Sequence, residues 1–113
     1  MKLIIAFIKP HKLPDVTLAL QAIEELSGAS ISDIRGFGRG RGKSAEDRIR
    51  DGLIDYMPRT RLELACPDTL VDHVVSVVEK HAHTGLREDG KIYVYGLDQA
   101  VRISTGERGE EAV

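Results

Sequence analysis

Apolar residues follow one another without a break near the start of the chain, at positions 3–8. A continuous apolar run of this length, rich in β-forming residues, predicts a strand buried on both faces, which ends before Pro10. Beyond Pro14 the spacing of the apolar residues becomes that of a helix, with Val16, Leu20 and Ile23 on one face. The pattern therefore predicts a central strand and then a helix that stops near residues 27–28.

Three further strands and a second helix follow from the same reasoning. The half-alternating segment 29–35 and the apolar segment 61–66 predict the second and third strands, and 91–95 predicts the fourth. Asp68 is expected to cap a helix with a single apolar stripe, made of Leu70, Val74, Val77, Val78 and His81. Residues 100–104 are expected to add a short fifth strand.

The order strand, helix, strand, strand, helix, strand is that of the ferredoxin-like fold, an α+β sandwich with an antiparallel sheet and both helices on one face. With 42% apolar residues, residues 1–113 are expected to form a single domain that ends in a charged tail at 105–113. The second face of the sheet stays open in so small a chain. Oligomerisation through that face is the expected way to bury it.

Composition narrows the possible partners and compartments. A net charge of −2 argues against general affinity for nucleic acid, which usually requires a clear basic excess. Cys66 is the only cysteine, so an intrachain disulfide is excluded, and this residue is expected to be a small buried hydrophobe. The early apolar run is too short for a membrane span or a signal peptide, so we expect a cytoplasmic protein.

A run of glycine and arginine at positions 36–42 directly follows the second predicted strand. Each glycine lets a ligand approach the main chain, and each arginine supplies donors that match phosphate or carboxylate oxygens. The run predicts an anion site. Gly-rich basic segments are as often flexible solvated loops, so both interpretations stay open at this point.

The segment between the second and third strands, residues 38–59, is longer than compact domains normally tolerate unless it has a function. Its charges are mixed, with the cations Arg39, Arg41, Lys43, Arg48 and Arg50 against the anions Glu46, Asp47, Asp51 and Asp55. A partner-docking arm is the favoured interpretation, because loops that are only structural are rarely this long. A solvated hairpin is the alternative.

Other chemistry finds little support in the sequence. His81 and His83 lie two residues apart near a helix end and point to different faces, so no metal site is expected. Cys66 has no adjacent histidine and the serines stand in no activating motif, so catalysis is not expected either. An RNA-binding ferredoxin-like module is the alternative function, although such sheets stack bases on strand aromatics, and the chain has only two phenylalanines and three tyrosines.

Several short motifs stand in a definite order along the chain: Met1-Lys2-Leu3, Ile8-Lys9-Pro10, Gly36-Phe37-Gly38-Arg39, Pro67-Asp68, Asp89-Gly90-Lys91-Ile92, Val101-Arg102-Ile103 and Thr105-Gly106-Glu107-Arg108-Gly109. Together they span nearly the whole chain, and in this order they resemble the PII signal-transduction family. Separated motifs in the right order are much more specific than any one of them.

The resemblance implies a homotrimer of ferredoxin-like protomers that binds an adenine nucleotide, ATP, ADP or AMP, in clefts between subunits, as a sensor and not an enzyme. By position, the nucleotide would contact Ser30, Gly36, Phe37, Gly38, Arg39, Glu63, Ala65, Gly90, Lys91, Arg102 and Ser104. Segment 38–59 corresponds to the family's T-loop, which would dock through Arg41, Lys43, Arg48 and Arg50. A membrane transporter or a regulated enzyme is the implied target, and a transporter would recruit the protein to the membrane.

Four positions depart from the nitrogen-sensing members of that family. Gly40 stands where they place a glutamine that helps to hold magnesium and 2-oxoglutarate, so magnesium is left to water and 2-oxoglutarate is expected to bind weakly. Gly52 stands where they place a modifiable tyrosine. Ser104 replaces an arginine, which removes one phosphate contact, and Glu88 replaces a common glycine, which places a repelling carboxylate near the phosphates. Any preference for ATP over ADP or AMP is therefore expected to be small or reversed. The chain therefore resembles a divergent, PII-like protein outside the nitrogen branch.

Overall fold

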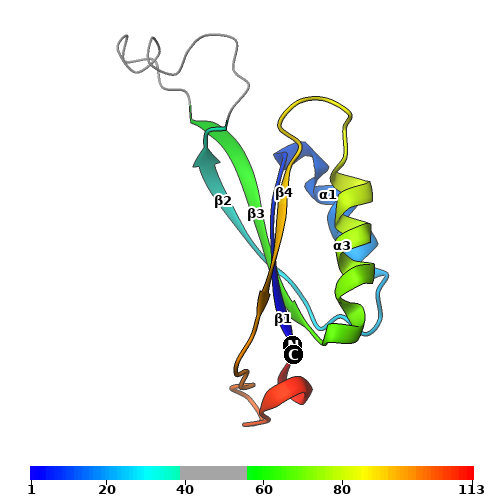
Figure 1. Cartoon of the computed structure of the whole chain (residues 1–113), viewed down its shortest axis with the longest axis vertical. Coiled ribbons are helices and arrows are strands. Elements are labelled where there is room, and N and C mark those ends of the chain that lie inside the picture. Colours follow the sequence, from blue (N-terminus) through cyan, green and yellow to red (C-terminus); the bar gives the residue numbers. More distant parts are fainter. Residues whose placement is uncertain (39–55) are drawn as a thin grey trace.

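The computed structural model describes residues 1–38 and 56–113, which form one antiparallel sheet with two helices on one side (Figure 1). The strand order is β2-β3-β1-β4, with β1 (Lys2–Ile8), β2 (Ser30–Gly36), β3 (Met57–Cys66) and β4 (Gly90–Gly96). The helices are α1 (Leu13–Gln21), α3 (Asp68–Ala82) and the short 3-10 helices η1 (Pro10–Lys12) and η2 (Gly109–Ala112). This arrangement confirms the expected ferredoxin-like fold. In the described part of the chain no helix is long and apolar enough to cross a membrane.

The hydrophobic core fills the space between the sheet and the two helices. Alternation along β1 turns Ile4, Ala6 and Ile8 towards the helices. They pack in one cluster with the apolar side chains of the two helices, namely Val16, Leu20, Val74 and Val78. Cys66, at the end of β3, is only 1% exposed in this core, and its burial raises the pKa of the thiol. The prediction of a small buried cysteine is therefore confirmed.

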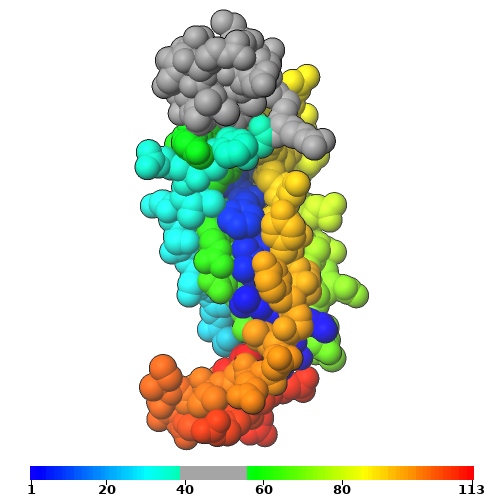
Figure 2. Space-filling view, turned by 60° about the vertical axis from the view of Figure 1, so that its left-hand side comes forward, coloured from blue at the N-terminus to red at the C-terminus, as the bar shows by residue number. Residues whose placement is uncertain are grey.

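The opposite face of the sheet, which we call the open face, carries no helix among the described residues, and Figure 2 shows its four strands side by side. The register places Phe7 of β1 beside β4, where its ring meets Tyr93 edge to face with 6.1 Å between ring centroids. Tyr93 and Tyr95 are 43% and 50% exposed on this strand. One protomer thus leaves aromatic surface uncovered.

Strand β3 begins four residues earlier than the sequence pattern indicated, at Met57 and not at residue 61. Its first residues pair with the end of β2, with Gly36 opposite Met57 and Arg35 opposite Pro58. Pairing with β1 starts only at Thr60, so Pro58 lies where β3 has a single neighbour and a missing N–H is tolerated. The pattern missed this extension because a proline and polar residues resemble a loop. The loop is correspondingly shorter than 38–59.

The predicted fifth strand at 100–104 does not join the sheet in the described structure, and that prediction was wrong. The chain instead turns back on itself: Arg102 donates its N–H to Glu107 at 2.9 Å, and Gly109 donates to Ala100 at 3.0 Å. Gly106 makes this turn possible with a φ of +75°. We call residues 100–109 the C-terminal hairpin. These residues pair with one another and not with the sheet.

Asp68 does not cap helix α3, contrary to the prediction. The residue before it, Pro67, takes the N-cap position in an extended conformation, and no side-chain capping bond is present. The Asp68 carboxylate accepts a hydrogen bond from the N-terminal ammonium of Met1 at 2.8 Å instead, and this bond lowers the pKa of Asp68. A charged donor is a stronger partner for the carboxylate than a backbone N–H.

Candidate functional site

An open hollow of about 880 Å³ lies at the end of the sheet where β2 ends and β4 begins. We call it the glycine cleft. Its lining comes from segments far apart in the sequence, namely Phe7, Ile34, Gly36, Phe37, Gly38, Arg59, Glu88, Asp89, Gly90 and Lys91. In Figure 1 the loop from α3 to β4 lies at this same end of the molecule. Residues 36–38 of the glycine run and the Gly90-Lys91 pair, both predicted to contact a nucleotide, therefore line one cleft.

Gly90 is the position in this cleft where only glycine fits. Its φ is +111°, and a Cβ built on it would lie 1.7 Å from the carbonyl oxygen of Phe7. The bare backbone lets β4 enter the sheet tightly against β1, where Gly90 pairs with Ile8. This close approach fixes the backbone at the start of β4, so the next residue, Lys91, lines the cleft with its cationic side chain.

The loop before β4 is held by Asp89. Its carboxylate accepts hydrogen bonds from the Thr84 N–H at 2.8 Å, the Gly85 N–H at 3.3 Å and the Thr84 hydroxyl. Lys9 adds an ion pair, with its Nζ at 3.2 Å from Oδ1. These bonds hold the pKa of Asp89 well below its usual range, and the hydrogen bond from the Thr84 hydroxyl has the largest effect. The carboxylate therefore organises the segment that lines the cleft.

This network predicts a pH dependence of stability. Because the folded-state pKa of Asp89 lies below that of the unfolded chain, about 3.9, its contribution is fully present above that value and is lost as the pH falls beneath it. We expect the free energy of unfolding of the parent to fall more steeply below about pH 4 than that of Asp89→Asn in urea titrations. Asp98→Asn, the same charge change in an exposed turn, should follow the parent. Parallel curves for all three proteins would contradict the assignment.

Arg59 is a cleft residue that the sequence analysis missed, because it placed Arg59 in the loop. Strand β3 turns it onto the cleft opposite Ile34, and its Nη2 lies 2.9 Å from Oε2 of Glu88. Glu88 was expected to stand near the phosphates as a repelling charge. Its carboxylate does line the cleft, but it is paired with this guanidinium. No local signal in the sequence points to this pair, because the two residues are 29 positions apart.

The remaining predicted nucleotide contacts lie elsewhere in the protomer. Ser30 and Glu63 face each other across β2 and β3, and Ala65 follows two residues on. Ala65 is eight residues along β3 from Met57, the partner of Gly36, which amounts to about 26 Å at the strand rise of about 3.3 Å per residue. Arg102 and Ser104 lie on the C-terminal hairpin, at the end of the molecule opposite the cleft (Figure 1). One protomer does not bring the predicted set together.

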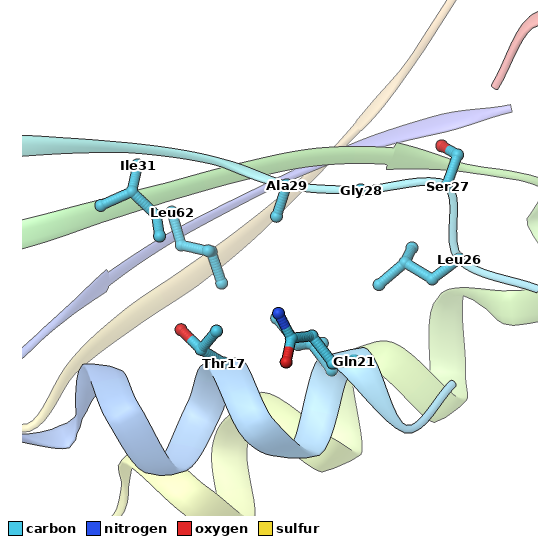
Figure 3. A pocket seen from close by; sticks show the side chains of 9 residues that line it. Thr17, Gln21, Leu26, Ser27, Gly28, Ala29, Ile31 and Leu62 are labelled. Atoms are coloured by element: carbon cyan, nitrogen blue, oxygen red, sulfur yellow. The ribbon is translucent and has the colours of Figure 1, made fainter. Parts of the chain in front are cut away.

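A second hollow, of about 410 Å³, lies between α1 and β2. Figure 3 shows Thr17 and Gln21 of the helix pointing towards it from one side, with Ile31 and Leu62 across from them. None of its described lining residues is charged, so nothing there offsets the cost of taking a phosphate out of water. The glycine cleft, which has Arg59 and Lys91, suits an anion much better.

The histidines do not form a metal site in the described structure. His81 lines a shallow groove between α1 and α3, whereas Nδ1 of His83 lies 3.4 Å from Asp89 in the loop. In residues 1–38 and 56–113 no group of three His, Cys, Asp or Glu side chains is placed to hold a metal ion.

Comparison with known proteins decides the family. The family model described as nitrogen regulatory protein P-II matches residues 1–107. This chain belongs to the P-II family. It is 43% identical to the nitrogen regulatory protein P-II of Haemophilus influenzae over 113 residues, which is the whole of both chains. It is 44% identical to P-II 2 of Methanothermobacter thermautotrophicus, covering all of this chain and 97% of that one. The resemblance inferred from the motifs is thus confirmed.

The fold comparison agrees with this assignment. The Arabidopsis thaliana PII structure, determined with bound citrate, superposes with a TM-score of 0.80 at 30% identity, covering 99% of this chain and 91% of that chain. The relatives are named as regulatory proteins, and membership of the P-II family agrees with the expectation of a sensor and not an enzyme. The placement outside the nitrogen branch stays a prediction.

Part of the predicted P-II site lies outside the described residues. Arg39 of the nucleotide set and the docking residues fall in 39–55, as do the departures at Gly40 and Gly52. The base of the T-loop is described, and there the rings of Phe37 and Tyr56 meet edge to face with 5.7 Å between centroids. This contact joins the two ends of the loop directly beside the glycine cleft.

Proposed function

We propose that this P-II protein senses an adenine nucleotide in clefts shared between the subunits of a homotrimer, and signals by docking its T-loop onto a target. The target would be a membrane transporter or a regulated enzyme. The protein would work in the cytoplasm and be recruited to the membrane when a transporter is the partner.

One observation carries the proposal, namely the division of the predicted nucleotide contacts between two ends of the protomer. The glycine cleft offers Gly36, Gly38 and Lys91, while Arg102 and Ser104 are at the other end. A single nucleotide does not reach from one set to the other within one chain. Two copies arranged so that the cleft of one meets the C-terminal hairpin of the next would complete the site.

Exposed apolar surface supports such an assembly. Ile103, between Arg102 and Ser104 on the C-terminal hairpin, is 99% exposed. A fully exposed isoleucine on an arm that packs little against its own protomer is typical of a contact with another subunit. The open face of the sheet, with Tyr93 and Tyr95, offers further surface for burial.

Each group of residues would have its own role in the shared site. The glycines would let the main chain approach the ligand, and Lys91 with the neighbouring subunit's arginine at position 102 would neutralise the phosphates. By their positions in the family, Ser30, Glu63 and Ala65 would lie near the adenine and ribose. Ser104 offers one phosphate contact fewer than an arginine would, and Gly40 offers magnesium no side-chain ligand.

The test of this function joins assembly with binding. Light scattering should report about three chain masses at micromolar concentration, and calorimetry on the same sample should detect ATP, ADP or AMP. A stable monomer would contradict the shared site, since the cleft and the hairpin would then never meet. A trimer that binds none of the three nucleotides would contradict the sensing role while leaving the assembly in place.

The T-loop prediction concerns residues outside the described part of the chain. Deleting residues 43–52 should leave the trimer and its nucleotide affinity within about twofold of the parent while abolishing capture of the target. A pull-down from native membranes with and without nucleotide measures this. Arg48→Ala with Arg50→Ala is the milder variant, and capture that depends on these charges should weaken with salt. If the deletion unfolds the protein, the loop is structural and the docking proposal fails.

A further inference from the structure

The glycine cleft already contains an anion of its own, the carboxylate of Glu88. Its Oε2 accepts a hydrogen bond from Nη2 of Arg59 at 2.9 Å, and the two side chains are only 24% and 15% exposed. Nη1 of the same guanidinium donates to the Pro58 carbonyl at 2.9 Å, which holds Arg59 in place. A paired, largely buried carboxylate therefore lies on the surface that a ligand's phosphates would approach.

The backbone aims this carboxylate into the cleft. Glu88 has a φ of +64°, the only left-handed non-glycine residue in the described part of the chain. Such a conformation is unfavourable for a residue with a Cβ and persists only where the surroundings impose it. Here the next residue, Asp89, is anchored by Thr84, Gly85 and Lys9, so the loop cannot relax freely. Backbone strain held in place beside a cleft points to a function of the strained residue.

Charge balance in the cleft gives that function. Its described lining residues include two cations, Arg59 and Lys91, and two anions, Glu88 and Asp89. Asp89 is bonded to Lys9 and to N–H groups of its own loop, whereas Glu88 forms an ion pair with Arg59, one of the two cations of the cleft. The guanidinium fork that would best match a phosphate is thus partly engaged before any ligand arrives.

We propose that Glu88 is a specificity-determining residue of the glycine cleft, a resident anion that occupies Arg59 and must be displaced by the phosphate chain of a nucleotide. This inference rests on the proposed function. Displacement penalises every nucleotide that reaches Arg59, and it penalises most the nucleotide whose terminal phosphate needs that cation. Glu88 therefore narrows the difference in affinity between ATP and AMP.

Glu88→Gln tests this directly, because it keeps the size of the side chain and removes its charge. Calorimetric titrations with ATP, ADP and AMP would be run on the parent, on Glu88→Gln and on Glu25→Gln. The last variant makes the same charge change at an exposed position beyond α1. We expect Glu88→Gln to bind ATP roughly tenfold or more tightly, to change AMP affinity much less, and to show a steeper salt dependence. Glu25→Gln should match the parent.

A second variant, Glu88→Gly, removes the carboxylate and the left-handed strain together, and should shift ATP affinity in the same direction. Unchanged ATP affinity in both variants, or an equal gain in Glu25→Gln, would overturn the inference while the parent's own binding leaves the proposed function standing. Weaker ATP binding would also overturn it, because Glu88 would then serve to orient Arg59 for the ligand. If neither the parent nor any variant binds a nucleotide, the proposed function fails and the inference fails with it.

Discussion

Gly90→Ala is expected to lower the free energy of unfolding by roughly 3 kcal/mol or more, a large part of the about 5–15 kcal/mol that a domain typically has. The added Cβ would lie 1.7 Å from the Phe7 carbonyl oxygen, an overlap with main chain and not with a side chain that could rotate away. Relief requires β4 to separate from β1 at their paired ends, and the φ of +111° adds strain that alanine tolerates poorly. Urea denaturation followed by circular dichroism measures the loss.

Gly96→Ala is the matched control, at the other end of the same strand. A Cβ there meets no atom within 4 Å, and its φ lies outside the range that disfavours side chains. Its free energy of unfolding should stay within about 1 kcal/mol of the parent. Equal stabilities for both alanine variants would mean that β4 enters the sheet differently from the way described here.

Arg102→Ala is expected to weaken nucleotide binding by roughly ten- to a hundredfold, the effect of losing one charge-assisted contact to a phosphate. In the protomer the Arg102 guanidinium reaches only the Glu111 carbonyl, at a long 3.5 Å, among the hydrogen bonds seen in the described residues. Its removal should therefore cost little stability. Calorimetry with ADP and thermal unfolding on the same preparation separate the two effects.

Arg108→Ala removes the same charge from the same hairpin and serves as the control. Residue 108 pairs through its backbone with Val101, a contact that alanine keeps, and its side chain is exposed. Nucleotide affinity should stay near that of the parent. Equal losses in both variants would assign the effect to the overall charge of the hairpin and not to a specific contact by Arg102.

Hydrophobic periodicity alone predicted the strand and helix order, because core positions such as Ile4, Leu62 and Val74 recur with the periods of strands and helices. Periodicity failed where the structure depends on pairing with a distant strand, or on which of two donors a side chain accepts a hydrogen bond from. The residues from Met57 to Thr60 have no strand pattern of their own, and they are extended because they pair with β2. Asp68 looks like a cap, and only the fold brings the N-terminal ammonium to its carboxylate.

The candidate site was partly visible in the sequence for a similar reason. The glycines near 36–38 and the Gly90-Lys91 pair are local motifs, and the structure brings them together. The pairing of Arg59 with Glu88 spans 29 positions and depends on where β3 starts, so no local pattern contains it. The separation of Arg102 from the cleft likewise becomes visible only once the C-terminal hairpin is placed.

The central claim is that one nucleotide site is built from two chains, and mixing subunits tests it most directly. Lys91→Ala chains lack the cleft cation and Arg102→Ala chains lack the hairpin cation, so each pure trimer should bind nucleotide poorly. Co-refolding equal amounts should restore about a quarter of the clefts to parental affinity, because an intact cleft forms wherever a chain with Lys91 meets a neighbour with Arg102. The number of tight nucleotide sites per chain, measured by calorimetry on the mixture, gives this fraction. If the mixed trimers recover no tight sites, the two residues do not act across a subunit boundary and the shared-cleft account is wrong.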